Sequence, residues 1–250
     1  MTTEKEIQKH IKKQHSGRNF SRTVIPVMKI IAYIHTDFPT KFGIPRQSGL
    51  VDTLKAAIVF EPEYRNPDAL RGLERFSHIW LIWEFSEAVR DIWSPMVKPP
   101  RLGGNTRMGV FATRSPFRPN AIGLSSVKLD RIEMNTEFGP ILYVTGADLM
   151  DNTPIYDIKP YLSYTDSHPE AVGGFADPVK DYILKVIFPE QWLSMIPEER
   201  RTALFGVLSY DPRPSYHNDP MRIYGFEFAG FDIRFTVLDH VLTVCEIVVL

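Results

Sequence analysis

The stretch from residue 98 to 118, KPPRLGGNTRMGVFATRSPFR, carries several cations and neither Asp nor Glu. Guanidinium groups bind phosphates and carboxylates through paired, charge-assisted hydrogen bonds. Prolines at 99, 100 and 116 stiffen the backbone, so this stretch has the properties of a fixed surface for an anionic ligand. The alternative is that each cation pairs with an acid elsewhere, but solvated faces usually mix both signs, which favours the ligand interpretation. The cations are Lys98, Arg101, Arg107, Arg114 and Arg118.

Carboxylates concentrate in a second segment, residues 148–161, DLMDNTPIYDIKPY. Asp148 and Asp157, together with Lys159, could bind ribose hydroxyls, orient a base or take part in proton transfer. Asp151 begins an Asp-Asn-Thr-Pro sequence that is typical of a turn, so a structural role is favoured for that residue. A metal site is disfavoured, because no histidine accompanies these carboxylates at ligand spacing.

A third segment, GIPRQSG at residues 43–49, combines unusual backbone freedom with polar side chains. Gly43 and Gly49 permit tight turns, and Pro45 stiffens the chain between them. Arg46 and Gln47 offer donors for a planar polar ligand. An ordinary surface loop would have a similar composition, so this segment by itself leaves the two interpretations equally open.

Several common cofactor and catalytic motifs are missing from the sequence. It contains no G-x-G-x-x-G after a strand, no P-loop, no H-E-x-x-H and no G-x-S-x-G. A nucleotide-like cofactor would therefore be held in neither the Rossmann nor the P-loop manner. The single cysteine, Cys245, excludes a disulfide framework and a multi-cysteine zinc site.

Short apolar runs separated by Gly and Pro must position these segments. The aromatic run HIWLIWEF predicts a buried strand that turns out of the core at Ser86-Glu87, and Asn66 predicts the cap of a short helix ending near Phe76. This pattern favours a mostly β domain, either open or closed into a barrel, over a doubly wound α/β fold. The predicted strands are 27–34, 54–60, 78–85, 109–113, 125–133 and 141–149.

A different texture begins after residue 168 and predicts a small α+β domain. Residues 197–208 have the proline, early acids and apolar spacing of a helix. Residues 224–237 alternate between apolar and polar side chains around Ala229-Gly230, which predicts a hairpin. Residues 181–188 and 240–250 are predicted to add further strands.

The charge distribution bears on the class of partner. The net charge is −1, which argues against binding nucleic acid by bulk charge alone. Residues 1–23 form a basic arm, for which a solvated tail is the favoured interpretation. Neither an apolar stretch of about 18 residues nor a signal-peptide block is present, so we expect no membrane span and a cytoplasmic location.

The three polar segments and the aromatic strand resemble the TsaA-like (TrmO) family. Members of this family are tRNA methyltransferases that add a methyl group to N6 of threonylcarbamoyladenosine beside the anticodon. A further match lies in the C-terminal region found in the longer bacterial members. The matching runs are FGIPRQSGLV (42–51), LRGLERFSHIWLIWEF (70–85), VKPPRLGGNTRMGVFATRSPFRPNAIGLS (97–125), DLMDNTPIYDIKPYL (148–162) and DPRPSYH (211–217).

The resemblance implies a fold, a cofactor and an assembly. The expected fold is mostly β, with a single-sheet β-barrel methyltransferase domain at residues 24–168 and a smaller α+β C-terminal domain at residues 169–250. The expected cofactor is S-adenosylmethionine, with no metal, and the expected assembly is a homodimer that acts on the anticodon stem-loop of tRNA.

The resemblance also implies individual roles. Bacterial relatives often carry His-Gln at positions 86 and 87, so we expect main-chain contacts from Ser86 and Glu87. Asn152 replaces a common Gly, and Asn tolerates left-handed backbone geometry. The cofactor-binding residues implied are Pro45, Arg46, Gln47, Ser86, Glu87, Arg114, Leu124, Thr145, Gly146, Ala147 and Asp148.

Methyl transfer to an exocyclic nitrogen needs alignment and a proton acceptor. Asp148 and Asp157 are the candidate acceptors. Loop nucleotides are accessible to such a protein because their bases can be splayed out. The alternative is a non-enzymatic, dimeric S-adenosylmethionine- or RNA-binding module, which the departure at Ser86-Glu87 motivates. The tRNA-binding candidates are Arg101, Arg107, Arg118, Lys159 and Arg213.

Overall fold

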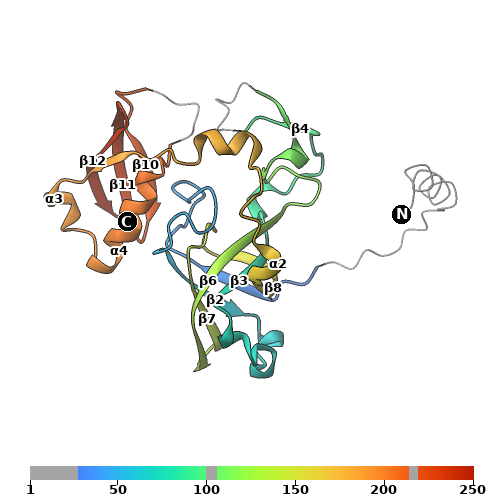
Figure 1. Cartoon of the computed structure of the whole chain (residues 1–250). Helices are drawn as coiled ribbons and strands as arrows, with labels where there is room; N and C mark the ends of the chain where they lie inside the picture. Colours follow the sequence, from blue (N-terminus) through green and yellow to red (C-terminus); the bar gives the residue numbers. More distant parts are fainter. Residues whose placement is uncertain (1–27, 100–105, 214–218) are drawn as a thin grey trace, which may run out of the picture.

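The computed structural model describes residues 28–99, 106–213 and 219–250. Within these residues, six strands close into an antiparallel barrel in the order β1-β2-β7-β6-β3-β8 (Figure 1). The predicted mostly β class, with an N-terminal barrel, is confirmed. The predicted arm at residues 1–23 lies outside the described residues. The barrel strands are β1 (Ala32–His35), β2 (Lys55–Phe60), β3 (His78–Glu84), β6 (Ile122–Thr136), β7 (Gly139–Thr145) and β8 (Thr153–Pro160).

Alternation along each strand fills the barrel. In β3, Ile79, Leu81 and Trp83 point inward, and the residues between them face outward. The longest strand, β6, shifts register near Leu129 and again after Glu133. Such irregularities increase local bending and twist, which helps a sheet of this size to close.

Some predicted elements differ from those observed. Asn66 does act as a cap, because its side chain accepts a hydrogen bond from Asp68 N. The helix is nevertheless divided into η2 (Pro67–Leu70) and η3 (Leu73–Arg75), since Gly72 at φ 91° interrupts it. The strand predicted at 109–113 is wrong, because only the first of these residues belongs to a strand. Strand β8 (Thr153–Pro160) is absent from the predicted strands, because its polar residues are typical of a turn or a site, although it pairs with both β1 and β3 in the barrel.

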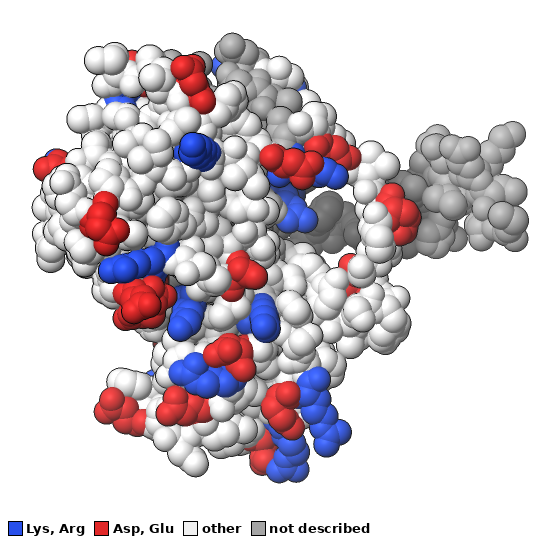
Figure 2. Space-filling model, turned by 60° about the vertical axis from the view of Figure 1, so that its left-hand side comes forward, with Lys and Arg blue, Asp and Glu red and all other residues white. Residues whose placement is uncertain are grey.

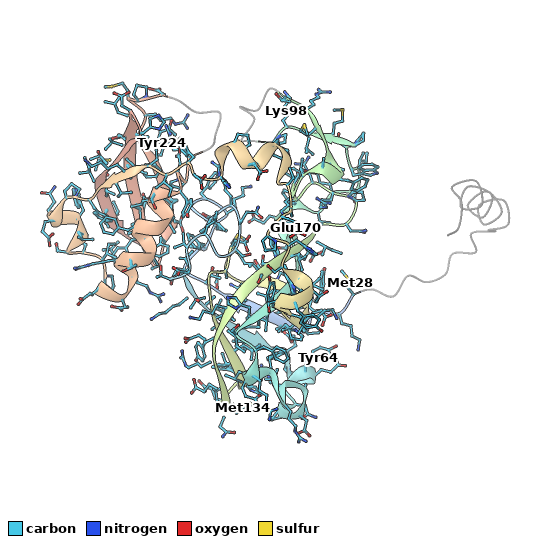
Figure 3. The ribbon with its side chains drawn as sticks, viewed as in Figure 1. Met28, Tyr64, Lys98, Met134, Glu170 and Tyr224 are labelled. Atoms are coloured by element: carbon cyan, nitrogen blue, oxygen red, sulfur yellow. The ribbon has the colours of Figure 1, made fainter. Side chains whose placement is uncertain are left out.

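Residues 86–99 and 106–118 form an extension beyond the barrel, which leaves β3 at Ser86 as predicted. A short β4–β5 hairpin lies at its far end (Figure 1). The Trp93 and Phe111 rings are 6.1 Å apart. Figure 3 places Lys98 at the end of the molecule opposite Met134. The elements of the extension are η4 (Ser86–Ala88), β4 (Met96–Val97), β5 (Met108–Gly109) and η6 (Val110–Ala112). A further short helix, η1 (Pro62–Tyr64), lies between β2 and η2.

The C-terminal region is a sheet with strand order β10-β11-β12-β9 and accompanying helices. The predicted hairpin is confirmed, and Ala229 and Gly230 form its turn with φ angles of 51° and 83°. The helix α2 (Ser163–Asp166) follows β8 and lies beside the barrel, where Trp80 Nε1 donates to Asp166 Oδ2 at 2.9 Å (Figure 1). The elements of the C-terminal region are η7 (Gly174–Val179), β9 (Lys185–Ile187), α3 (Glu190–Leu193), α4 (Glu198–Ser209), β10 (Tyr224–Phe228), β11 (Phe231–Leu238) and β12 (Val241–Val249).

The boundary between the two hydrophobic cores differs from the boundary between the barrel and the C-terminal sheet. One core fills the barrel. The other lies between the C-terminal sheet and α4, and it also contains Phe38, Val51 and Leu54, which come from the segment between β1 and β2. Figure 1 shows this blue segment between the C-terminal sheet and the barrel. The segment that carries GIPRQSG therefore packs against the C-terminal region.

Candidate functional site

The GIPRQSG segment lies directly against the end of β7. Gly49 N donates to Gly146 O at 2.9 Å, and Gly146 N donates to Leu54 O at 2.9 Å. Gly146 adopts φ 80°, a left-handed conformation that favours glycine. A Cβ at Gly146 would also lie 3.4 Å from Gly49 Cα. Glycine at this position therefore allows the two segments to approach closely.

Asp148 is the most deeply embedded carboxylate of the site. Its Oδ1 accepts from Ser125 Oγ at 2.6 Å, and Ser125 Oγ in turn accepts from Trp83 Nε1 at 2.9 Å. The Ser48 main chain also hydrogen-bonds the carboxylate. Burial raises the pKa of Asp148 above its ordinary value, although these hydrogen bonds and the charge of Arg114 act in the opposite direction. Asp148 thus joins the barrel interior to the 43–49 loop.

Arg114 brings the third sequence segment to the same place. Its guanidinium donates to Gln47 Oε1, and the Gln47 amide donates to Arg46 O. Arg114 also lies near enough to Asp148 to lower its pKa. Because Arg114 remains exposed, part of its donor fork still faces solvent. The arrangement leaves a cation available to an anion beside a carboxylate.

The remaining cofactor candidates on the 43–49 loop, β6 and β7 surround this group. Pro45 and Ala147 are buried and shape the backbone, and Thr145 is half-buried at the end of β7. Leu124 is 57% exposed on the outer face of β6, one residue before Ser125. An exposed leucine beside buried polar groups offers an apolar contact to a ligand.

Ser86 and Glu87 lie in η4, directly after β3. Glu87 forms an ion pair with Lys41 at 3.9 Å, and both side chains are largely exposed. This contact puts η4 next to the segment that leads into GIPRQSG. The Glu87 carboxylate is engaged on the surface, which is compatible with the expected main-chain contacts.

Asp157 and Lys159 lie apart from Asp148. They form an ion pair of 2.9 Å on β8, where Asp157 pairs with Ile82 of β3 in the sheet register. Asp157 also accepts from Ile158 N. Within the described part of the chain, no hydrogen bond or ion pair connects Asp157 with Asp148. The predicted cluster of carboxylates is therefore dispersed.

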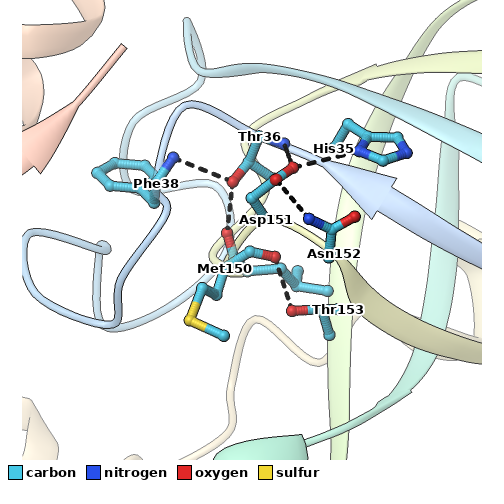
Figure 4. Close-up of polar contacts among 8 residues, drawn as sticks. His35, Thr36, Phe38, Met150, Asp151, Asn152 and Thr153 are labelled. Carbon is cyan, nitrogen blue, oxygen red and sulfur yellow. Dashed lines mark hydrogen bonds and ion pairs between the residues drawn. The ribbon is translucent and has the colours of Figure 1, made fainter. Parts of the chain in front are cut away.

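Asp151 supports the turn that precedes β8, as predicted (Figure 4). Its Oδ1 accepts from Thr36 N at 3.0 Å and lies 3.3 Å from His35 Nδ1. Asn152 adopts φ 60°, a left-handed geometry that Asn tolerates. Thr36 Oγ1 donates to Leu149 O at 3.1 Å. These bonds attach the turn after Asp148 to the end of β1.

The predicted tRNA-binding cations have different environments. Arg107 is exposed, and no hydrogen bond or ion pair joins it to another residue that the structure describes. Arg118 donates to Thr113 O at 2.8 Å and so braces its own loop. Arg213 is paired with Asp211 through two contacts of 2.8 Å and its side chain is 9% exposed. A phosphate contact by Arg213 would require breaking this pair. Arg101 lies outside the described residues.

Outside residues 98–118, acidic and basic side chains are less segregated from one another. On the face shown in Figure 2, acidic and basic side chains are interspersed. The extension differs, since from 98 to 118 its sequence contains no acid. A cationic surface that is confined to one extension agrees with a net charge near zero.

Sequence reasoning missed several participants. Trp83 and Ser125 anchor Asp148 from inside the barrel, and the alternation of β3 and β6 was the signal that could have placed them there. Arg90 was also missed; its guanidinium lies 3.9 Å from the centre of the Phe117 ring. That contact joins η4 to the Arg114 loop and depends on a fold in which distant segments meet.

The groups gathered here suit a ligand with an anionic, a hydroxylated and an apolar part. Arg114 can bind a carboxylate, Asp148 can accept from hydroxyls, and Leu124 can contact an apolar ring. S-adenosylmethionine has all three parts, so the residues present fit the cofactor expected from the resemblance. Among the described residues, no group of three or more His, Cys, Asp or Glu side chains could hold a metal ion. None of the helices described is long and apolar enough to cross a membrane.

Comparison with protein families supports the same resemblance along the chain. The model of the tRNA-methyltransferase O N-terminal domain matches residues 33–167. The model of the TrmO C-terminal domain matches residues 182–250. Together the two models cover the barrel and the C-terminal sheet.

Individual relatives agree. The chain is 39% identical over 217 residues to the tRNA (adenine(37)-N6)-methyltransferase of Escherichia coli, covering 84% of this chain and 92% of that protein. It is 45% identical over 163 residues to the enzyme of the same name from Eikenella corrodens, covering 65% of this chain and 91% of that one. A crystal structure of TrmO from P. aeruginosa superposes with a TM-score of 0.71 at 32% identity, covering 89% of this chain and 96% of that one.

Proposed function

The chain belongs to the TrmO family, and from this premise we propose that it is an S-adenosylmethionine-dependent methyltransferase acting on N6 of adenine 37 in tRNA. The substrate base carries a threonylcarbamoyl group in this proposal. One observation carries the assignment: the 43–49 loop, the end of β7 and the Arg114 loop meet around Asp148. This convergence provides a cation, a half-buried carboxylate and an exposed leucine at a single place.

Cofactor binding would use the residues that converge there. When bound, S-adenosylmethionine supplies a methyl group on a positively charged sulfur for in-line transfer. Arg114 binds the anionic end, and Gln47 holds the Arg114 guanidinium in place. Leu124 contacts the apolar part, while main-chain groups of the loop and of Thr145 to Ala147 enclose it, and those of Ser86 and Glu87 lie alongside. Alignment of this kind supplies much of the rate acceleration expected for a simple displacement.

Asp148 is the better of the two proton-acceptor candidates. The N6 nitrogen forms a bond to the methyl carbon and must lose a proton during or after that step. Burial raises the pKa of Asp148, which makes its carboxylate a stronger base than an exposed one. Asp157 is already paired with Lys159. We therefore assign proton acceptance, or orientation of the group that performs it, to Asp148.

Binding of the anticodon stem-loop would use the extension. Arg107 is exposed and would contact phosphates. Arg118 would keep the loop that presents Arg114 in order, through its hydrogen bond to Thr113 O. Lys159 adds a cation on β8, although its pairing with Asp157 reduces its effective charge. Arg101 completes the set in the sequence, outside the described residues.

The extension also supports a homodimer. Ile92 is 85% exposed, Phe111 73% and Val89 61%, which is unusual for apolar side chains gathered on one element of a monomer. A dimer formed there would bury these side chains and bring together the cations of two copies. We assign the barrel domain to residues 24–168, the C-terminal domain to residues 169–250, and the protein to the cytoplasm, where its tRNA substrate is found. Light scattering that shows only monomer at micromolar concentration would refute the dimer.

The function is tested by incubating purified protein with isotopically labelled cofactor and tRNA that carries or lacks the threonylcarbamoyl group. We expect labelled methyl in the modified nucleoside, detected by mass spectrometry of digested tRNA. Cofactor binding without methyl transfer, even in a single turnover, would favour the non-enzymatic module. Calorimetry that shows no cofactor binding by well-folded protein would refute the enzyme and leave only an RNA-binding module.

A further inference from the structure

The segment between β1 and β2, residues 36–54, is docked onto the C-terminal region at both of its ends. Near its start, Arg200 Nη1 of α4 contacts Asp37 Oδ2 at 2.5 Å, and Ala229 N of the β10–β11 turn donates to Asp37 O at 2.9 Å. Phe38 is 1% exposed, and its ring lies 5.3 Å from that of Phe228. Near its end, Val51 packs on α4, where a Cβ on Gly206 would lie only 2.6 Å from Val51 Cγ1. The segment thus spans the junction.

The cofactor loop itself contacts β10. Gly43 is buried at φ 84°, and a Cβ on Gly43 would lie 2.2 Å from Phe226 Cδ2. Phe226 is 4% exposed and is held in turn by Phe235, at 6.1 Å between ring centres. The ring therefore forms a fixed wall behind the loop, and only glycine at position 43 leaves room for it.

A polar contact reaches the same loop from the chain that follows α4. Arg46 Nη2 donates to Arg213 O at 3.4 Å. The Arg213 backbone is held by its ion pair with Asp211, whose φ of 54° is left-handed. Arg213, a predicted tRNA contact, thus faces the cofactor loop through its carbonyl oxygen.

On its other side the loop faces the reaction site, through Gly49 to Gly146 and through Ser48 to Asp148. The loop is therefore held between the barrel and the C-terminal sheet. We propose that the C-terminal domain is a positioning element for cofactor binding, in which Phe226 holds the 43–49 loop against Asp148. This inference rests on the proposed function for the identity of the ligand. The predicted consequence is that a residue with no cofactor contact sets cofactor affinity.

A double-mutant cycle between Gly43 and Phe226 tests the proposal in the full-length protein. In Gly43→Ala the new methyl group collides with the ring and displaces the loop, so the Kd for S-adenosylmethionine should rise by about tenfold or more. Phe226→Ala removes the ring atoms Cγ, Cδ2 and Cε2 that this methyl group would meet, and it should alone weaken cofactor binding several-fold. In Gly43→Ala/Phe226→Ala the collision is relieved, and the Kd should fall below that of Gly43→Ala.

Two matched controls separate positioning from general destabilisation. Phe205→Ala truncates a phenylalanine of α4 whose ring lies against Phe188, 5.4 Å away, and should neither change the Kd more than about twofold nor rescue Gly43→Ala. Gly49→Ala imposes similar backbone strain at φ 77°, but a Cβ there meets nothing within 4 Å. The binding defect of Gly49→Ala should be unaffected by Phe226→Ala. Equal effects of Phe226→Ala and Phe205→Ala, or the absence of rescue, would overturn the proposal.

Hydrogen exchange provides a readout that needs no cofactor. The Gly49 amide, bonded to Gly146 O, should exchange faster in Phe226→Ala than in Phe205→Ala at equal global stability. If the wild-type protein fails to bind S-adenosylmethionine, the proposed function is wrong, and this exchange difference still decides whether β10 positions the loop. Identical Gly49 exchange in the two variants would refute positioning even if the cofactor binds normally.

Discussion

The site around Asp148 and the extension at residues 86–99 and 106–118 are both polar, but they are built in opposite ways. Around Asp148, each group is held by the next, from Trp83 through Ser125 to the carboxylate. On the extension, Arg107 is exposed beside exposed apolar residues such as Phe111. The first arrangement fixes geometry, whereas the second presents charge to a large partner. Single substitutions should therefore affect the two regions by different amounts and in different observables.

The largest effect is expected at Asp148. Asp148→Asn keeps an acceptor for Ser125 Oγ but removes the negative charge and the base. The rate constant of methyl transfer, measured in a single turnover, should fall by about 100-fold or more, the range typical of a lost general base. Asp130→Asn is a suitable control, because Asp130 is an exposed carboxylate of β6 paired with Arg131. Comparable losses in the two variants would remove Asp148 from the mechanism.

Arg114→Ala should have the next largest effect, on cofactor binding before tRNA binding. It removes a cation that is held in place by Gln47. Hydrogen bonds to charged groups contribute about 1.5–3 kcal/mol, so the Kd for S-adenosylmethionine should rise by roughly 10- to 100-fold. Calorimetry for the cofactor and fluorescence anisotropy for tRNA would measure the two affinities separately. A loss confined to tRNA binding would move Arg114 from the cofactor site to the extension's surface.

Arg107→Ala should weaken tRNA binding by only a few-fold and reduce the slope of log K against log salt by about one. Cofactor affinity should stay close to wild type because Arg107 is remote from the Asp148 network. Arg118→Ala should flatten the salt dependence too, but it also removes the bond to Thr113 O and so disorders the Arg114 loop. Titrations over a range of salt concentrations distinguish the two. An unchanged slope for Arg107→Ala would show that this side chain touches no phosphate.

The smallest effect concerns the dependence of stability on pH. Because burial raises the pKa of Asp148, the folded protein retains a proton over a window in which the unfolded chain has lost it. This group's contribution to the free energy of unfolding therefore falls as pH rises from the ordinary carboxyl pKa through the raised one. Asp148→Asn should gain stability relative to wild type across that window, measured by urea denaturation. If the difference in free energy of unfolding between Asp148→Asn and wild type is independent of pH, the raised pKa of Asp148 is contradicted.

Much of the fold could be predicted because its signals are local. Alternation in HIWLIWEF and in residues 224–237 reports which side chains are buried, whatever the sheet order. The helix after Asn66 was harder to predict, because Gly72 divides it through a backbone angle that composition does not reveal. Strand β8 was hard to predict for a related reason, because its polar sequence does not show that it pairs with β1 and β3 to close the barrel.

The candidate site was only partly predictable. The sequence segments around Arg46, Arg114 and Asp148 stood out by composition, and the structure brings them together. Nothing in the segment around Asp157 shows that its carboxylate would lie on the outside of the barrel and pair with Lys159. The side chain of Arg213 likewise resembles a surface cation until its pairing with Asp211 is seen.

The sequence alone determined the class of the protein, the polar segments that carry its chemistry and the strands that fill its barrel, because each depends on residue type and spacing over short distances. Only the tertiary structure decided which carboxylate lies half-buried beside Arg114. It also decided that the 43–49 loop, which belongs to the barrel in sequence, packs on the C-terminal core through Gly43 and Phe226. Burial, pKa and close approach depend on groups far apart in the chain, and their values arise only when the fold brings those groups into contact.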